Sequence, residues 1–174
     1  MPEQLKITFS PLKLEDIKLR TKWIQNPKVK ANLGWQIRNG VTHKDNVRWF
    51  NRYQKNKYDK RFTVKANGIP VGLVGLTGQN PVDKHAELFI MIGEDEYRGL
   101  GIGRKACEYI IKYGFEKLKL HKIFLAVYSY NLPAINLYKS LGFEVEGVLK
   151  EQVFYDQKYQ DEIQMGLINP SERK

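Results

Sequence analysis

The sequence predicts one mixed α/β domain spanning residues 1–174, in which about seven strands form a mostly antiparallel sheet and about four helices flank it. Three observations support this fold class. The chain has 174 residues, which is the usual size of a single domain. Its hydrophobic patterns follow the order β, α, α, β, β, β, α, β, α, β, β. Asn67-Gly68 joins two of the β-rich runs, as expected of a tight hairpin turn.

The first half of the chain is expected to contain two helices before this hairpin. Apolar side chains recur at helical spacing over residues 14–24, and acidic residues occupy the first turn, where the helix dipole favours them. Asn26-Pro27 is expected to end this helix. Thr42 is a residue type that caps helices, and it precedes a second helical pattern at residues 43–56. The strands of this half are expected at residues 5–9, 61–66 and 69–76.

The second half is expected to form a parallel crossover followed by a hairpin. Residues 87–92 are apolar except at the first position, which is typical of a strand buried on both faces. A helix at residues 104–118 leads to a second buried strand at residues 122–128, and such a connection makes the two strands parallel. The remaining elements are a short helix at residues 133–141, which Gly142 is expected to end, and strands at residues 143–155 and 158–168.

The net charge of +10 comes from the first half of the chain. Residues 1–84 hold 17 Lys and Arg against 6 Asp and Glu, whereas residues 85–174 hold 12 against 13. A positive field of this kind favours anionic partners such as a nucleotide, a phosphate or RNA. A lysine-rich face can equally be a solvated surface without a partner, so the charge alone does not decide between the two.

The composition excludes several classes of protein. No run approaches the roughly 20 apolar residues of a membrane helix, and the N-terminus is too polar for a signal peptide, so a cytoplasmic location is expected. The single cysteine, Cys107, excludes an intrachain disulfide and is expected to be a small buried residue. His43 and His121 have no Cys, Asp or Glu companions at ligand spacing, so no metal site is expected.

A glycine-rich turn at residues 98–103 separates an expected strand from an expected helix. Glycines lack the Cβ atoms that would keep an anion away from backbone N–H groups, and the helix dipole adds attraction for negative charge. The turn therefore predicts a diphosphate site, although a tight structural turn would also use such glycines. It is not a P-loop, because no Gly-Lys-Ser/Thr ending follows, and a Rossmann strand would stand nearer the start of its domain.

Two motifs together resemble the acetyl-coenzyme A site of the GNAT acetyltransferases. The first, Arg/Gln-x-x-Gly-x-Gly/Ala, is matched by Arg98, Gly101 and Gly103. The second, beyond the next expected helix and strand, is matched by Asn131, Ala134, Tyr138, Gly142 and Phe143. The resemblance spans residues 61–167. Within the superfamily it is greatest to the group of ribosomal-protein N-terminal, spermidine and nucleotide-amino-sugar acetyltransferases.

The resemblance implies a GNAT-like fold that uses acetyl-CoA as co-substrate and no metal. It places the acetyl-CoA-binding core at about residues 85–143 and the helices that wall the acceptor site at about residues 11–56. In this family the strand at residues 87–92 splays from its neighbour and pairs with the pantetheine arm. The residues implied in binding acetyl-CoA are Ile90, Met91, Ile92, Arg98, Gly99, Leu100, Gly101, Ile102, Gly103, Arg104, Asn131 and Tyr138.

Tyr138 and Glu87 are the candidate catalytic residues. The resemblance places the Tyr138 phenol near the thioester sulfur, and a phenol is protonated at neutral pH, so it can donate to the departing thiolate. Glu87 is the only acid in an otherwise apolar strand, where a carboxylate is costly to bury without a role, so it is the candidate general base. The structural alternatives are an ion pair for Glu87, a core position for Tyr138 and a helix cap for Asn131. His85 is a weaker candidate base.

The acceptor amine is the least determined part of the function. The positive first half is expected to repel spermidine and to suit an amino sugar on a nucleotide diphosphate, or a ribosomal-protein N-terminus reached by docking on rRNA. The side chains that could bind such a nucleotide, or could instead be core and solvated residues, are Trp35, Trp49, Tyr53, Tyr58, Arg38, Arg48, Arg52 and Arg61. The alternatives are a spermidine acetyltransferase and a non-catalytic domain that binds acetyl-CoA or RNA. A homodimer is left open.

Overall fold

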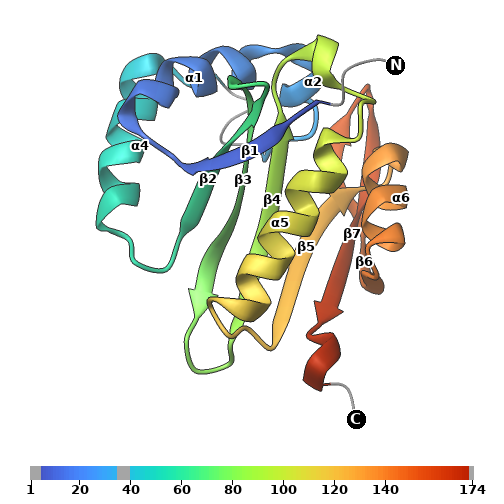
Figure 1. Cartoon of the computed structure of the whole chain (residues 1–174). Helices are drawn as coiled ribbons and strands as arrows, with labels where there is room; N and C mark the ends of the chain where they lie inside the picture. Colours follow the sequence, from blue (N-terminus) through green and yellow to red (C-terminus); the bar gives the residue numbers. More distant parts are fainter. Residues whose placement is uncertain (1–4, 35–39, 173–174) are drawn as a thin grey trace.

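A seven-stranded sheet forms the centre of the computed structural model, which describes residues 5–34 and 40–172 (Figure 1). The strands, in spatial order, are β1 (Ile7–Pro11), β2 (Lys60–Ala66), β3 (Ile69–Asn80), β4 (His85–Ile92), β5 (Lys122–Tyr128), β7 (Lys158–Ile168) and β6 (Glu144–Tyr155). The described α-helices are α1 (Ile17–Gln25), α2 (Pro27–Lys30), α4 (His43–Lys55), α5 (Ile102–Glu116) and α6 (Leu132–Ser140). All neighbouring strands are antiparallel except β4 and β5, which α5 connects. The predicted fold class and the parallel crossover are therefore confirmed.

The short turns have the conformations that their residue types predict. Asn67 and Gly68 have φ angles of 49° and 84°, so both occupy the left-handed region that a two-residue hairpin requires. Gly142 follows α6 with a φ of 91°. Thr42 caps α4, since its hydroxyl accepts a hydrogen bond from the Asp45 N–H at 3.2 Å while the Asp45 carboxylate accepts one from the Thr42 N–H at 3.1 Å.

Asn26-Pro27 both ends α1 and begins α2. The Asn26 side chain accepts a hydrogen bond from the Lys28 N–H at 3.0 Å. Pro27 occupies the first position of α2, where a backbone N–H is not needed. The expected end of the helix at this dipeptide is confirmed, and a second short helix begins there because a capping residue followed by proline is also a helix start.

The sheet separates two hydrophobic clusters. On one face α5 packs Ile102 and Ile110 against the sheet, together with Cys107, which is fully buried as predicted. Burial raises the pKa of the Cys107 thiol to about 12, which makes it an unreactive core residue. On the other face α1 and α4 cover the sheet with Trp23 and Phe50. Both clusters include residues of the central strands β3 and β4.

The prediction that β4 is buried on both faces is wrong. Ala86 and Leu88 are buried, but Glu87 between them is exposed. The same alternation occurs in β5, where Leu125 is buried and Ala126 is exposed. The second face of both strands opens onto a pocket. Pocket walls are also largely apolar, so the hydrophobic pattern alone cannot distinguish a strand that lines a pocket from one that crosses a core.

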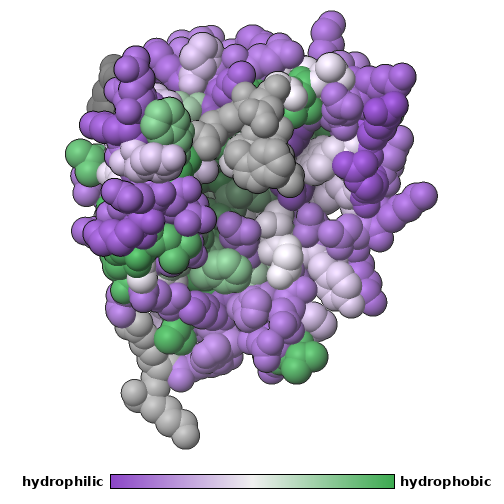
Figure 2. All heavy atoms as spheres, turned by 180° about the vertical axis from the view of Figure 1, so that it is seen from behind, coloured by the Kyte–Doolittle hydropathy of each residue, from purple (hydrophilic) through white to green (hydrophobic). Residues whose placement is uncertain are grey.

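Hydrophilic side chains cover most of the face seen from behind, and apolar ones gather around its centre (Figure 2). An apolar area framed by polar groups is common at ligand sites.

No helix within residues 5–34 and 40–172 has both the length and the apolar character that a membrane span requires.

Candidate active site

The parallel strands β4 and β5 separate part-way along their length. They pair at three positions, of which Glu87 opposite Phe124 is the last, and both strands then continue without pairing to each other. Ile90, Met91 and Ile92 lie on the separated part of β4. Backbone groups that β4 turns toward this gap have no partner on β5, so an extended ligand can pair with them as an added strand.

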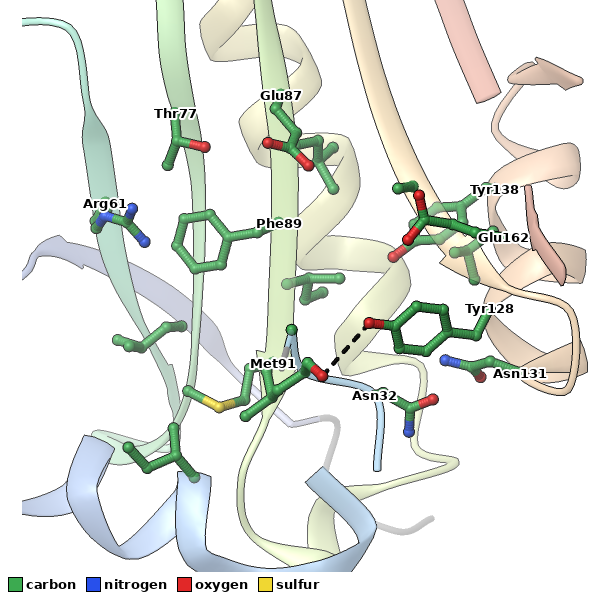
Figure 3. A pocket seen from close by; sticks show the side chains of 18 of the residues that line it. Asn32, Arg61, Thr77, Glu87, Phe89, Met91, Tyr128, Asn131, Tyr138 and Glu162 are labelled. Atoms are coloured by element: carbon green, nitrogen blue, oxygen red, sulfur yellow. Dashed lines mark hydrogen bonds between the residues drawn. The ribbon is translucent and has the colours of Figure 1, made fainter. Parts of the chain in front are cut away.

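The gap opens into a pocket of about 400 Å³ (Figure 3). Residues of α1, β2, β3, β4, β5, α6 and β7 line it, together with the segment that follows α2. Its polar side chains are Arg20, Asn32, Arg61, Thr77, Glu87, Tyr128, Asn131, Tyr138 and Glu162. The volume is that of a site for a small ligand, with a few polar groups set in apolar walls.

Two carboxylates face the pocket, Glu87 from β4 and Glu162 from β7 (Figure 3). The pKa of Glu87 is raised above its usual value, first because the surrounding protein removes part of its hydration and then because Glu162 is negative; Arg61 opposes the shift. Glu162 was not among the predicted site residues. It stands in a strand of alternating polar and apolar side chains, where an acid is ordinary, and only the pairing of β7 with β5 brings it to the pocket.

Arg20 of α1 and Arg61 of β2 bring positive charge to the same pocket. Arg61 forms an ion pair with Asp59 at 3.2 Å, and its guanidinium lies 4.4 Å from the Phe89 ring. Arg20 is 8% exposed, and its guanidinium lies 4.0 Å from the centre of the Trp49 ring. Burial, and then the charge of Arg61, lower the pKa of Arg20 to about 10, so Arg20 is still a cation at neutral pH. The basic half of the chain therefore contributes two cations to the pocket.

Tyr138 and Asn131 lie on the α6 side of the pocket (Figure 3). Asn131 caps α6 by accepting a hydrogen bond from the Ala134 N–H at 3.4 Å. The Tyr138 ring packs against Phe143 with ring centres 5.8 Å apart, and the residue is 8% exposed. Burial is the main cause that raises the pKa of Tyr138. Its hydroxyl has no hydrogen-bond partner among the described residues, so a proton can be donated to a ligand.

The glycine-rich turn before α5 presents free backbone N–H groups. Gly99 and Gly101 have φ angles of 74° and 76°, and nothing lies within 4 Å of the place where a Cβ would stand on either. Along residues 99–104 no backbone N–H donates to a described residue, and the first bond runs from the Lys105 N–H to the Gly101 carbonyl at 3.2 Å. Several N–H groups at a helix N-terminus next to open space form a cradle that fits a diphosphate.

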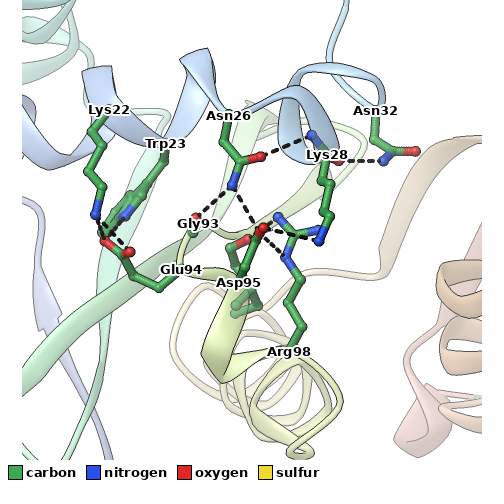
Figure 4. Close-up of polar contacts among 10 residues, drawn as sticks. Lys22, Trp23, Asn26, Lys28, Asn32, Gly93, Glu94, Asp95 and Arg98 are labelled. Carbon is green, nitrogen blue, oxygen red and sulfur yellow. Dashed lines mark hydrogen bonds and ion pairs between the residues drawn. The ribbon is translucent and has the colours of Figure 1, made fainter.

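The arginine side chains of the turn are engaged within the protein. The Arg98 guanidinium donates a hydrogen bond to the Ile92 carbonyl at 3.1 Å and lies 3.2 Å from the Asp95 carboxylate (Figure 4). Arg104 donates to the Ser140 hydroxyl at 2.6 Å. In this arrangement Arg98 fixes the turn to the end of β4, and the backbone N–H groups are the free donors.

A polar network ties α1 and the residue that follows it to the same turn (Figure 4). The Glu94 carboxylate accepts hydrogen bonds from the Lys22 ammonium and the Trp23 indole N–H, both at 2.8 Å. The Asn26 amide donates to the Asp95 carboxylate at 2.9 Å. Helices expected at the acceptor side are therefore joined directly to the segment that positions the N–H cradle.

Replacing Glu94 with Gln is expected to lower the free energy of unfolding by about 1–2 kcal/mol at pH 7, because two hydrogen bonds to a charged acceptor are weakened. The hydrogen bonds from Lys22 and then Trp23 hold the pKa of Glu94 below its usual value. Its stabilisation is therefore complete above the unfolded pKa of about 4.3 and is lost as the pH falls through the lower folded pKa. Urea unfolding at pH 7 and pH 3.5 measures this loss.

The matched control for this prediction is Glu96→Gln, which changes an exposed neighbour that has no hydrogen bond or ion pair within the described residues. Glu96→Gln is expected to leave the free energy of unfolding nearly unchanged at both pH values. An equal loss of stability in the Glu94 and Glu96 variants would contradict the role given to Glu94.

Most of the aromatic and arginine side chains expected to bind a nucleotide do not line the pocket. Arg61 lines it, whereas Trp35 and Arg38 lie outside the described residues. Trp49 and Tyr53 stack on each other with ring centres 5.7 Å apart. Three more members of the expected set are exposed and do not line the pocket: Tyr58, Arg48 and Arg52.

His85, the weaker candidate base, does not line the pocket. Its ring packs against Phe124 with ring centres 5.5 Å apart. Within the described part of the chain, no three or more His, Cys, Asp or Glu side chains are grouped as metal ligands. The acid and base candidates of the pocket are therefore carboxylates and a phenol.

Known proteins resemble this chain in sequence and in structure. Residues 6–144 match the sequence family described as an acetyltransferase (GNAT) domain. A spermidine N(1)-acetyltransferase of Escherichia coli (strain K12) is 30% identical over 165 residues, which cover 95% of this chain and 87% of the relative. The crystal structure of spermidine N-acetyltransferase from Vibrio cholerae in complex with CoA and spermine has a TM-score of 0.86 at 28% identity, covering 93% of this chain and 95% of that one. A dodecameric structure of the same Vibrio cholerae enzyme has a TM-score of 0.82 at 28% identity, covering 93% of each chain.

Proposed function

Because this chain belongs to the GNAT acetyltransferase family and is an acetyl-CoA-dependent N-acetyltransferase, we propose that its pocket acetylates a small primary amine with Glu87 as general base and Tyr138 as general acid. One observation carries this proposal. The gap between β4 and β5 begins at Glu87, and Tyr138 faces the same pocket from α6. A reacting carbonyl in the gap therefore has a base and an acid within one cavity.

The residues around the gap fit acetyl-CoA along its length. The free N–H groups of residues 99–104 suit the diphosphate, and the separated edge of β4 suits the extended pantetheine arm. When bound, acetyl-CoA supplies an activated acetyl group. The backbone N–H groups near Ile90, Met91 and Ile92 can stabilise the negative charge that develops on the carbonyl oxygen.

The proposed reaction uses one proton acceptor and one proton donor of this chain. Glu87 removes a proton from the ammonium group of the acceptor, directly or through a water molecule. The neutral amine nitrogen then forms a bond to the acetyl carbon while the carbon–sulfur bond breaks. Tyr138 donates its proton to the departing sulfur, and the amine nitrogen loses its second proton to solvent. The products are an amide and the free thiol of CoA, and solvent returns Tyr138 and Glu87 to their starting states.

Replacing Gly101 with Ala is expected to weaken CoA binding about tenfold. A side chain at a φ of 76° costs about 1–2 kcal/mol, and the turn relieves this strain by rotating its N–H groups out of the cradle. Isothermal titration of CoA measures the loss. Gly68→Ala is the matched control, because Gly68 has a φ of 84° with the same open surroundings and lies in the β2–β3 hairpin. Equal CoA affinities in the two variants would show that the N–H groups of residues 99–104 do not bind the diphosphate of CoA.

A polyamine is a second candidate acceptor. The spermidine acetyltransferases of Escherichia coli and Vibrio cholerae support it, as does the presence of two carboxylates, Glu87 and Glu162, in one pocket. The positive first half of the chain favours instead an amine that carries an anion, such as a nucleotide-linked amino sugar. Neither the named relatives nor the described contacts support docking on a ribosome.

Self-association of the chain is also part of the proposal. β6 is an edge strand of the sheet. It exposes Val145, Val148, Leu149 and Phe154, and Tyr159 of the adjacent β7 is exposed as well. An apolar edge strand is a common site for pairing between copies, and the dodecameric relative supports an assembly. Light scattering of the purified chain measures its state, and a monomer at all concentrations would contradict this part.

The activity is tested by thiol release from acetyl-CoA in the presence of single amines. We expect release that depends on both acetyl-CoA and an amine, and an N-acetylated product detected by mass spectrometry. A protein that binds CoA tightly but releases no thiol with any amine of a broad panel would contradict the assignment of catalytic roles to Glu87 and Tyr138.

A further inference from the structure

Two guanidinium groups meet at the α1 and β2 side of the pocket. The Arg20 guanidinium lies 4.0 Å from the centre of the Trp49 ring, and that of Arg61 lies 4.9 Å from the same ring. Both arginines line the pocket that Glu87 and Glu162 also face. Figure 3 shows Arg61 beside Phe89 on one side of the pocket and Glu162 on the other. The pocket therefore has its cations on the α1 and β2 side and Glu162 on the opposite side, with Glu87 on β4 between them.

Arg20 is a buried cation that has no counter-ion among residues 5–34 and 40–172. It is 8% exposed, and it makes no hydrogen bond or ion pair within the described part of the chain. The charged group that acts on Arg20 is Arg61, which has the same sign. The charge of Arg61 is itself offset by Asp59 and Glu87.

A buried arginine that has no opposite charge among the described residues lowers the stability of the protein when no ligand is bound. A buried charge normally has a partner of opposite sign, whereas the contact that partly compensates Arg20 within the described residues is the Trp49 ring. An uncharged side chain of similar size could cover Trp49 without that cost. An opposite-charge partner for Arg20 can instead arrive with a ligand, because Arg20 lines a cavity that is large enough for one.

We propose that Arg20, together with Arg61, binds an anionic group of the acceptor, a carboxylate or a phosphate, while Glu87 and Glu162 receive its amine. The acceptor is then an amine that carries a negative group at its far end. This inference rests on the proposed acetyltransferase function and specifies the class of its substrate. It disfavours a polyamine, whose second ammonium group would meet the two arginines.

The first test compares acceptors of equal length that differ at the far end. The panel pairs each diamine with the amino acid and the amino-alkyl phosphate of the same length, from four to six carbons, and adds spermidine and a nucleotide-linked amino sugar. We expect kcat/KM to be at least tenfold higher for an anionic amine than for the matched diamine. The carboxylate and phosphate arms show which source of negative charge the site prefers.

Arg20→Met tests the residue itself. We expect this variant to lower kcat/KM for the preferred anionic amine by about 10–100-fold, mainly through KM, and to leave kcat/KM for the matched diamine unchanged or higher. The matched control is Lys18→Met, which removes one positive charge from the exposed face of the same helix and should leave the preference intact. Arg20→Lys keeps the charge and should retain part of the preference.

The second test measures the anion site without catalysis. Thermal denaturation of the CoA-free protein with increasing inorganic phosphate or acetate should show an increase in Tm. Arg20→Met should make this increase smaller and leave only the part that comes from the N–H groups of residues 99–104. Arg20→Met combined with Gly101→Ala should lower it further, and Gly101→Ala alone should keep the part that depends on Arg20. Arg20→Met should itself be as stable as the unmodified protein or more stable, because it removes an unpaired buried charge. A purely structural Arg20 would instead give an unstable variant.

The outcomes separate this inference from the proposed function. If no amine is acetylated but the Arg20-dependent anion effect is present, the catalytic proposal fails and the anion site stands. If amines are acetylated but diamines or spermidine are preferred, the inference is overturned and the acetyltransferase function stands. The same holds if Arg20→Met leaves the preference for anionic amines unchanged. If Arg20→Met does not fold, the same comparison with Arg20→Lys and Arg61→Met decides.

Discussion

Replacing Tyr138 with Phe is expected to lower kcat by about 10²-fold and to leave CoA affinity unchanged. The change removes only the hydroxyl, and general acid catalysis of this kind contributes at least that factor. Burial holds the pKa of Tyr138 above its usual value, so the phenol remains protonated at neutral pH. Steady-state kinetics and titration of CoA together separate the loss of turnover from a loss of binding.

Tyr109→Phe is the matched control for this variant. Tyr109 is also a partly buried tyrosine whose pKa burial raises, but it stacks on Phe9 with ring centres 4.0 Å apart and does not line the pocket. Its replacement is expected to leave kcat within about twofold of the unmodified enzyme. A Tyr138→Phe variant with unchanged kcat would show that another group protonates the leaving sulfur and that Tyr138 is a core aromatic residue.

The elements that could be predicted from the sequence are those whose conformation is determined by a few neighbouring residues. Asn67-Gly68 forms its hairpin and Thr42 caps α4 because the conformation depends on a few neighbouring residues. The two acetyl-CoA motifs were recognisable for a similar reason. Each is a continuous segment that includes the start of a helix, and Gly101 and Asn131 are the N-cap residues of α5 and α6.

The acceptor side of the site could not be predicted in the same way. Arg20, Arg61 and Glu162 come from α1, β2 and β7, and only the strand order brings these elements around one pocket. Each residue is ordinary in its own segment: an arginine in an amphipathic helix and an acid in an alternating strand need no explanation. The net charge indicates that cations matter, but it cannot show that Arg20 is buried with no counter-ion among the residues that the structure describes.

Replacing Glu87 with Gln is expected to lower kcat/KM by about 10²-fold or more and to remove the acid limb of the pH profile. The pKa of Glu87 is raised, so the carboxylate that accepts the proton accumulates only above a pH higher than that of an ordinary glutamate. Activity of the unmodified enzyme should therefore fall as the pH drops through this raised pKa. The variant should be at least as stable as the unmodified protein at neutral pH, because loss of hydration and the charge of Glu162 disfavour the ionised form in the fold.

The acceptor amine also titrates, so a pH profile alone does not identify Glu87 as the base. Glu162→Gln resolves the ambiguity, since it removes the negative charge that contributes to the raised pKa of Glu87 and leaves the amine in solution unchanged. The acid limb should move to lower pH in this variant when kcat/KM is measured against pH with one acceptor. An acid limb that stays in place in Glu162→Gln and persists in Glu87→Gln would belong to the acceptor, and the proton would then leave the amine by a route that does not use this carboxylate.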